Sequence, residues 1–276
     1  MAESQGIFTL YSGDEFLNYL EHTSFGRSVR LIQNHHTYSP SYKSFKNTTE
    51  SAFALLNGMR NFHMHTNGWS NIGQNITTFP DGTIALCRPI NDIPSCIKGA
   101  NTYGIGIEHL GNFGTEKDKP ENIDVMTPAH KDAIVFLNAA LCKKFSLTPN
   151  TESIVYHHWY DLNTGKRTNG TGVTKTCPGT TFFGGNTVQD AEKNFIPLIK
   201  QKLESLKANA TPQPEEKKGI VTANFLNVRD VAGLNGKVLR QLTQGTPVSI
   251  FFETNGWYKI SSANSEWINS KFVTLQ

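Results

Sequence analysis

The feature that most constrains this chain is an abrupt change of composition after Leu206. Residues 207–219 read KANATPQPEEKKG, with two prolines, four consecutive charged residues and no large apolar residue. A segment of this kind cannot bury a hydrophobic face and is typical of a solvated linker. It predicts two domains, residues 1–206 and 220–276, joined by a linker over residues 207–219.

The bulk composition limits the classes of protein to consider. With 37% hydrophobic and 18% charged residues, the 276-residue chain is typical of a soluble globular protein. The net charge of +3 does not indicate a nucleic-acid partner, and it suits weak attraction to an anionic matrix. No run of about 18 apolar residues occurs, so we expect no membrane span. Residues 1–10 lack a basic region followed by an apolar block, so we expect no secretory signal in this chain.

Strand-like and helix-like segments alternate in the N-terminal domain, which predicts an α/β fold. Strands are expected at residues 29–34, 83–87, 103–110 and 154–156, and helices at residues 48–60, 127–145 and 187–206. Residues 75–87 are expected to form a hairpin around the turn Pro80-Asp81-Gly82. Thr127 and Pro128 are typical of a helix N-cap and first helical residue, and Pro197 is expected to kink the last helix.

The C-terminal domain has a different pattern. Short strand-like segments occur at residues 226–229, 238–239, 248–250, 257–260 and 267–268, and Gly and Asn residues separate them. Several short strands with such turns predict a small all-β barrel.

The run Lys175-Thr176-Cys177-Pro178-Gly179 is the strongest candidate for a functional site. It places a cysteine beside a cation and fixes the backbone with a Pro-Gly turn. His35 follows the strand expected at residues 29–34, and a second histidine follows the strand at residues 154–156. If these side chains converge on Cys177, two imidazoles and one thiolate form a zinc site with an open fourth position.

Each histidine ligand has to be chosen from a pair of neighbours, His35 with His36 and His157 with His158. Successive side chains of a strand point to opposite faces, so one member of each pair faces a given site. We favour His35 and His157, and His158 stays open as the alternative ligand. A lone histidine at the end of a strand is more often only a polar strand end. The combination with Cys177 is what indicates a metal site.

The same residues predict hydrolytic chemistry. A zinc ion in such a site lowers the pKa of a bound water to about 7, which allows attack on an amide carbonyl. Lys175 lies two residues before the cysteine, so its ammonium is a candidate to stabilise the oxyanion of a tetrahedral intermediate. Glu108 lies in an otherwise apolar strand. It is either a solvent-facing residue or the general base that takes a proton from the water.

The four cysteines do not provide a disulfide framework. If Cys177 binds metal, at most one disulfide forms, and Cys87 with Cys96 is the pair close enough in sequence. Cys142 is expected to be a small buried hydrophobe in the helix at residues 127–145.

Five segments of the N-terminal domain carry a resemblance to a known family. They are residues 32–37 (IQNHHT), 63–73 (HMHTNGWSNIG), 80–84 (PDGTI), 104–108 (GIGIE) and 175–179 (KTCPG). In this order they resemble the type 2 N-acetylmuramoyl-L-alanine amidases, which share a fold with peptidoglycan-recognition proteins and phage endolysins. The resemblance covers roughly residues 25–200. It implies a mixed central sheet flanked by helices.

The resemblance also implies roles for individual residues. It implies one Zn²⁺ per catalytic domain, held by His35, His157 and Cys177. It further implies Lys175 as the oxyanion stabiliser and Glu108 as the general base.

This chain departs from the family at two positions. Gln74 stands where many members carry a catalytic tyrosine, and Cys96 lies in a segment where many relatives have a histidine. These differences concern contacts to substrate rather than the metal. His63 and Trp69 are expected to line the substrate groove, with a core position as the alternative for Trp69.

A second resemblance concerns the C-terminal domain. Residues 226–229 (LNVR), Gly245 and residues 256–260 (GWYKI) are similar to the bacterial SH3 domain. This resemblance implies a small SH3-like module that binds wall peptides and raises the local concentration of the attached domain.

Together the two resemblances imply a zinc-dependent hydrolase that cleaves the N-acetylmuramoyl-L-alanine bond of peptidoglycan. The expected partner is peptidoglycan, as muropeptide substrate and as wall peptide, with no nucleic acid. The expected place of action is the cell wall, extracellular or periplasmic, reached by lysis or another route, or after removal of a leader.

Two alternatives belong to other functional classes. One is a non-catalytic peptidoglycan receptor on the same fold, although such receptors typically lack a zinc ligand. The other is a cysteine peptidase acting on wall peptides, which Cys177 fits poorly because it lies downstream of its histidines.

Overall fold

The computed structural model describes residues 2–208, 217–254, 256–261 and 264–276. The chain divides into two compact units, Met1–Lys207 and Ala208–Gln276. The segment expected to be a linker, residues 207–219, lies mostly outside the described residues. Its last three residues begin strand β8 (Lys217–Val221), whose lysines are exposed and pair through the backbone with β11 (Pro247–Ile250).

The N-terminal unit is built on a seven-stranded sheet with the order β1-β2-β5-β4-β6-β3-β7. The strands are β1 (Glu3–Gln5), β2 (Phe8–Tyr11), β3 (Leu31–His36), β4 (Ile76–Thr78), β5 (Ile84–Leu86), β6 (Gly104–His109) and β7 (Ile154–Tyr156). β3 runs parallel to both β6 and β7, and β4 runs parallel to β6, whereas the other pairs are antiparallel. The sheet is therefore mixed, and the expected hairpin is present as β4 and β5.

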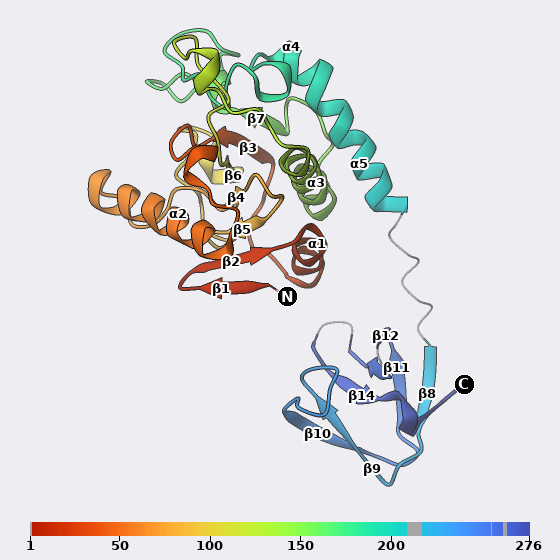
Figure 1. The fold of residues 1–276 in the computed structure, drawn as a ribbon. Coiled ribbons are helices and arrows are strands. Elements are labelled where there is room, and N and C mark those ends of the chain that lie inside the picture. Colours follow the sequence, from red (N-terminus) through yellow and green to blue (C-terminus); the bar gives the residue numbers. More distant parts are fainter. Residues whose placement is uncertain (1, 209–216, 255, 262–263) are drawn as a thin grey trace. The chain divides into compact units, whose positions relative to one another are not determined.

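Helices cover both faces of this sheet (Figure 1). The helices α1 (Gly13–His22), α3 (Pro128–Phe145) and α5 (Ile196–Ala208) contribute to one hydrophobic core, which includes Ile32 and Ile107 of the sheet. On the other face, α2 (Thr49–Asn61) packs through Phe53 and Leu56 against Phe8 of β2. Because strand side chains alternate between faces, the residues next to Ile32 and Ile107 point toward the face that α2 covers.

The ends of the helices follow from local sequence. Thr127 caps α3 by accepting a hydrogen bond from the backbone N–H of His130, and Pro128 occupies the first turn, as predicted. The last helix is not continuous, because a π-helical turn, Ala191–Phe195, separates α4 (Val188–Asp190) from α5. The wide turn ends two residues before Pro197, which lacks a backbone N–H for a regular helical bond.

A chain of polar side chains crosses the core between the sheet and α3. The Thr78 hydroxyl lies 2.8 Å from Nδ1 of His109 and 2.7 Å from Nε2 of His130. Nε2 of His109 lies 3.0 Å from Oδ1 of Asn34, and Nδ1 of His130 lies 2.7 Å from the hydroxyl of Tyr42. Burial lowers the pKa of His130 to about 3 and that of His109 well below its usual value, so both rings are neutral. The Thr78 hydroxyl therefore donates to one ring and accepts from the other.

We expect Thr78→Val to lower the unfolding free energy of the N-terminal unit by about 2–3 kcal/mol, because it leaves two buried ring nitrogens without a partner at unchanged volume. Urea denaturation of the full chain, with the transition of this unit followed separately, measures the change. Thr148→Val at an exposed position is the matched control and should change stability by less than about 0.5 kcal/mol. Equal stability of the two variants would contradict this account of the network.

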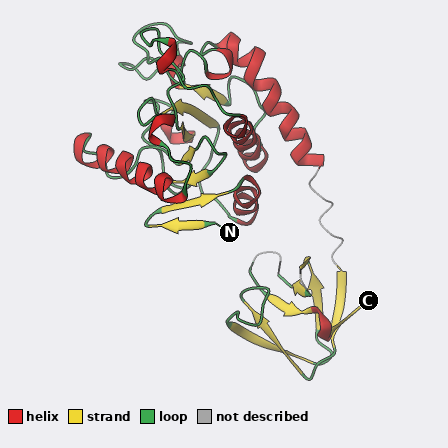
Figure 2. Cartoon of the chain, viewed as in Figure 1, coloured by secondary structure: helices red, strands yellow, loops and turns green. Residues whose placement is uncertain are grey.

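The C-terminal unit consists mainly of strands and turns, with a short 3-10 helix at Ser270–Phe272 (Figure 2). One sheet has the order β10-β9-β14-β13-β12 and the other the order β11-β8-β15. The strands not yet described are β9 (Phe225–Arg229), β10 (Val238–Thr243), β12 (Phe252–Thr254), β13 (Trp257–Lys259), β14 (Trp267–Asn269) and β15 (Val273–Leu275). Both sheets supply the core of this unit, for example Val228 and Ile268 from the first and Ile250 from the second. The small all-β prediction is confirmed.

None of the helices in the described residues is long and apolar enough to cross a bilayer.

Candidate metal centre

His35 and Glu108 are brought together by the pairing of two parallel strands. β3 and β6 run side by side, and His35 lies directly opposite Glu108 in their register. Both side chains point to the α2 face, since Ile32 and Ile107 belong to the core on the other side. His35 Nδ1 lies 4.0 Å from Oε1 of Glu108. The two residues are 73 positions apart in sequence, and only the register of the sheet makes them neighbours.

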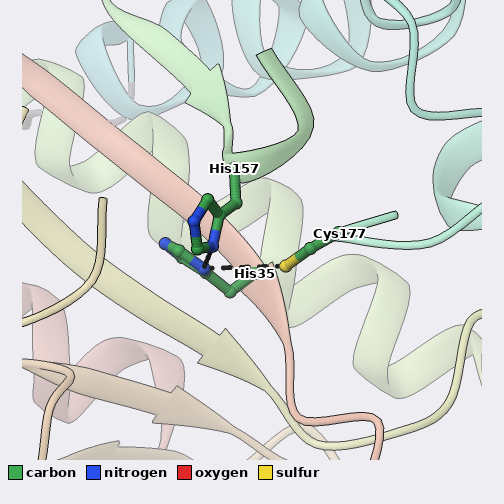
Figure 3. Close-up of side chains that lie close together, drawn as sticks. All are labelled: His35, His157 and Cys177. Carbon is green, nitrogen blue, oxygen red and sulfur yellow. Dashed lines mark hydrogen bonds between the residues drawn. The ribbon is translucent and has the colours of Figure 1, made fainter. Parts of the chain in front are cut away.

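His157 comes from the strand on the other side of β3. It directly follows β7 and begins the 3-10 turn His157–Trp159. Trp159 is fully buried and donates its indole N–H to the carbonyl of Asn186, which anchors the turn. His157 Nδ1 lies 3.2 Å from His35 Nδ1 (Figure 3).

Cys177 reaches the same point from a loop. Its Sγ lies 3.6 Å from His35 Nδ1, and its carbonyl accepts the backbone N–H of His158 at 2.8 Å. Gly179 shapes this loop, because its φ is +116° and a Cβ there would lie 2.4 Å from the carbonyl oxygen of Phe113. Figure 3 shows the three side chains converging from β3, from the turn after β7 and from this loop.

The neighbouring histidines have other partners. His158 Nδ1 lies 2.9 Å from the carbonyl of Lys175, so this ring supports the loop backbone. His36 Nδ1 accepts the backbone N–H of Phe113 at 3.1 Å. Within the part of the chain that the structure describes, the His, Cys, Asp and Glu cluster with ligand spacing consists of His35, His157 and Cys177.

The spacing of the three ligand atoms fits a tetrahedral zinc ion. Bonds of about 2.0–2.1 Å to nitrogen and 2.3 Å to sulfur place two ligand nitrogens about 3.3 Å apart, and a nitrogen and a sulfur about 3.6 Å apart. The observed distances from His35 Nδ1 are 3.2 Å to His157 Nδ1 and 3.6 Å to Cys177 Sγ. All three ligand atoms lie within 4.8 Å of one another.

The charge states of the three side chains also suit a metal. Burial, with smaller effects of His157 and Lys175, lowers the pKa of His35 well below its usual value. Burial and then Lys175 lower the pKa of His157 to about 4. Both imidazoles are thus neutral and hold a lone pair for a ligand bond. Burial raises the pKa of the Cys177 thiol, which would release its proton on binding a cation.

Glu108 has the properties of an acid–base group. Burial raises its pKa to about 8, and the Lys175 ammonium opposes that shift. The side chain is 22% exposed, and its Oε2 has no hydrogen-bond partner in the protein. A carboxyl group that gains and loses a proton near neutral pH is suited to general base and general acid chemistry.

A cavity of about 870 Å³ opens onto this cluster. His35, His157, Cys177, Glu108 and Lys175 all line it. Its other walls include Leu55, Met59 and Phe62 from the α2 region, the segment His36–Pro40 and the residues Thr115, Glu116 and Lys117. The cavity lining therefore includes apolar side chains from the α2 region and polar side chains from loops.

His63 and Trp69 lie together on the wall of this cavity. Their rings stack with centroids 4.8 Å apart at 29°, and His63 Nδ1 accepts the backbone N–H of Gly73 at 3.1 Å. A Cβ on Gly73 would lie 2.8 Å from the Trp69 ring, so a glycine permits this approach. Trp69 is 38% exposed and lies outside the hydrophobic cores. It therefore presents an aromatic edge to the cavity.

The profile of the N-acetylmuramoyl-L-alanine amidase family matches residues 25–180, which is more than half of the chain. The chain belongs to this family. The profile of the bacterial SH3 domain matches residues 224–274. We call the two units the amidase domain and the SH3 domain.

Individual relatives are more distant. Peptidoglycan-recognition protein SC1a of Drosophila melanogaster is 31% identical over 100 residues, which are 36% of this chain and 52% of that protein. The chain thus spans about half the length of this curated relative. The N-acetylmuramoyl-L-alanine amidase of Sus scrofa is 30% identical over 84 residues, which are 30% of this chain and 13% of that protein. Among solved structures, the amidase LysC from Clostridium intestinale URNW is 25% identical with a TM-score of 0.42, covering 66% of this chain and 89% of that chain.

The two departures from the amidase family both lie at the cavity. Gln74 lines it and is almost fully buried; its Nε2 donates to Thr77 Oγ1 at 3.0 Å, and its Oε1 has no partner in the protein. Thr77 is directly opposite Glu108 in the sheet. At the position of Gln74, where many relatives carry a tyrosine, this chain therefore has an amide that lies close to Glu108.

Cys87 and Cys96, the pair close enough in sequence for a disulfide, are not joined, since all four cysteines are free. Cys87 points into the core and lies 3.3 Å from Thr77 Oγ1. Cys96 lies against Gly106 of β6 and lines the amidase cavity. The prediction for Cys142 holds, because this side chain is buried in the core beneath α3.

Several cavity residues were not predicted. Glu116 lies on the rim, where Oε2 accepts a hydrogen bond of 2.5 Å from Thr176 Oγ1. This contact joins two loops that are 60 residues apart in sequence. A single polar residue in a loop carries no periodic signal, so Glu116 could not be chosen from the sequence.

Proposed function

We propose that the amidase domain is a zinc-dependent hydrolase that cleaves the bond between N-acetylmuramic acid and L-alanine in peptidoglycan. The observation that carries this proposal is the set of two neutral imidazoles and one thiol at zinc spacing, on the floor of the cavity. A bound zinc ion supplies Lewis-acid chemistry at this point. Membership of the amidase family supports the choice of bond.

The residues of the chain divide the remaining tasks. Glu108 lies 4.0 Å from His35 and takes a proton from the attacking water, then returns it to the leaving amide nitrogen. Lys175 lies on the loop that carries Cys177 and lines the same cavity. Its ammonium stabilises the negative charge that develops on the carbonyl oxygen. The stacked His63 and Trp69 hold the substrate against the wall of the cavity.

The experiment is a turnover assay on purified walls with three protein preparations: as isolated, stripped by a strong chelator, and stripped then reloaded with zinc. We expect new N-terminal alanine from the first and third preparations and none from the second. Elemental analysis should give one zinc per chain in the active preparations. Full activity of a verified metal-free preparation would contradict the proposal.

The first alternative, a non-catalytic receptor, is favoured by the likeness to peptidoglycan-recognition protein SC1a. The complete set of candidate zinc ligands argues for an enzyme, and the turnover assay separates the two. The second alternative, a cysteine peptidase, needs a thiol with a lowered pKa. Burial instead raises the pKa of Cys177.

We expect Lys175→Ala to lower kcat by about 10²–10³-fold while the protein keeps its zinc, because only the charge opposite the developing oxyanion is removed. Steady-state kinetics on a soluble muropeptide and elemental analysis measure the two effects. Lys117→Ala, at another cation on the wall of the cavity, is the matched control and should change kcat by less than about threefold. Equal losses in both variants would show that general positive charge, and not the position of Lys175, matters.

We expect Trp69→Ala to raise KM about tenfold and to leave kcat within about twofold, because an exposed aromatic wall binds ground state and transition state alike. Trp69→Phe should recover most of the affinity. A large fall in kcat at unchanged KM would contradict a role in binding alone.

A further inference from the structure

A row of side chains crosses the five-stranded sheet of the SH3 domain. In the printed register of neighbouring strands, Phe252 lies opposite Lys259, Lys259 opposite Trp267, Trp267 opposite Arg229, and Arg229 opposite Val238. Residues directly opposite each other share one face of a sheet. We call these five residues, one on each of β12, β13, β14, β9 and β10, the outer row.

The outer row lies on the face away from the domain core. Tyr258, Ile268 and Val228 are each one residue along from a member of the row, and all three belong to the core. Strand side chains alternate, so the row points the other way. Phe252 is 51% exposed and Val238 is 43% exposed, whereas the three residues between them are half-buried.

The first four members of the row alternate aromatic and cationic groups, and the fifth, Val238, is aliphatic. The rings of Phe252 and Trp267 meet edge to face with centroids 6.2 Å apart, on either side of the strand that carries Lys259. Arg229 donates one N–H to the carbonyl of Gly236 at 2.6 Å, and a guanidinium has five such donors. No acidic residue lies in the row, and the nearby Glu266 is paired with Arg240 at 2.6 Å.

Charge is distributed unevenly between the two domains. Residues 217–276 contain seven Lys and Arg against three Asp and Glu, whereas residues 1–207 contain 19 against 18. Most of the net positive charge of the chain therefore lies in the SH3 domain. A positive field of this kind attracts polyanions and raises their local concentration.

The spacing of the row indicates the kind of anion. Neighbouring strands lie about 4.8 Å apart, so the backbone positions of Lys259 and Arg229, two strands apart, are separated by about 10 Å. A single terminal carboxylate needs one cation. Two cations separated by a flat aromatic surface fit a linear chain whose anionic groups alternate with uncharged units. Phosphodiesters suit both partners, since lysine binds them as a point charge and arginine as a planar fork.

We propose that the outer row is a binding surface for a linear phosphate-bearing polymer of the cell wall. This proposal rests on the proposed function only because that function places the chain at a cell wall. The surface holds the polymer by its repeated phosphates, with the uncharged units of the chain lying over Trp267 and Phe252. Peptide stems, which carry isolated carboxylates, are the competing ligand.

The test measures binding of the full chain to walls that retain their phosphate polymers, to the same walls after hydrofluoric acid extraction, and to immobilised poly(glycerol phosphate). We expect binding to the first and third and at least a fivefold loss on the second. Lys259→Glu should weaken binding by on the order of fivefold or more, and binding of the native chain should fall steeply with salt. Lys271→Glu, with the same change of charge at an exposed position outside the row, should change affinity by less than about twofold.

Two further measurements keep the test decisive. Cleavage of a soluble muropeptide should be the same for the native chain and both variants, so a failed amidase proposal would be seen separately. Lys259→Gln should give an intermediate loss, and unchanged thermal unfolding of the SH3 domain should exclude misfolding. Equal binding to extracted walls, competed by free stem peptide, would overturn the proposal in favour of peptide recognition. Equal effects of Lys259→Glu and Lys271→Glu would overturn it as well.

Discussion

Cys177→Ser is expected to release the zinc and to lower kcat/KM by about 10³-fold or more, because a hydroxyl replaces the one soft ligand of a three-ligand site. In the structure, Cys177 Sγ lies 3.6 Å from His35 Nδ1. The zinc content of the purified protein should fall from one per chain to less than about one tenth. Elemental analysis and kinetics on the same preparation measure both effects.

Cys96→Ser is the matched control for this loss. Cys96 is a second thiol on the wall of the same cavity, but it is not a member of the ligand cluster. This variant should keep its zinc. If both variants lose the metal, or if Cys177→Ser keeps it, the assignment of Cys177 as the third ligand is wrong.

Glu108→Gln is expected to lower kcat by about 10²–10⁴-fold, because the amide keeps the shape of the side chain but cannot take up a proton. Zinc content should stay at one per chain, and KM should change by less than about threefold. The comparison with Cys177→Ser is informative, since one variant removes the metal and the other only a proton acceptor.

An unchanged kcat in Glu108→Gln would remove the residue from the mechanism. Gln74 could not take its place as the base, because its side chain is also an amide, although its Oε1 is buried without a partner in the protein and the residue lines the same cavity. Gln74→Met is the control for packing, because it keeps the length of the side chain and removes the amide. If Glu108 is the base, Gln74→Met should lower the melting temperature and leave kcat nearly unchanged.

The sequence predicted most of the elements that carry the site. The segments of residues 154–156 and 127–145 match β7 and α3 closely, since each has a clear hydrophobic pattern and, for α3, a capping signal. The strand before the first histidine is shifted, because β3 runs from Leu31 to His36 and includes both histidines. The pairing register of the strands could not be predicted, since a single sequence does not show which strands pair.

Two features of the N-terminal unit show why. His35 and Glu108 are adjacent because β3 pairs with β6 in one register, and a slip of one residue would point Glu108 to the other face. The hairpin of β1 and β2 was not predicted, because β1 is short, polar and fully exposed. Its turn contains Gly6 at a φ of +60°. A single glycine in the sequence does not show that the chain turns there.

The most direct test of the central claim is product analysis of one defined muropeptide by mass spectrometry, with the zinc-loaded and the metal-free protein side by side. The account predicts that only the loaded protein yields the free muramyl sugar and a peptide that begins with L-alanine. An intact muropeptide with the loaded protein, or cleavage within the peptide, would contradict it.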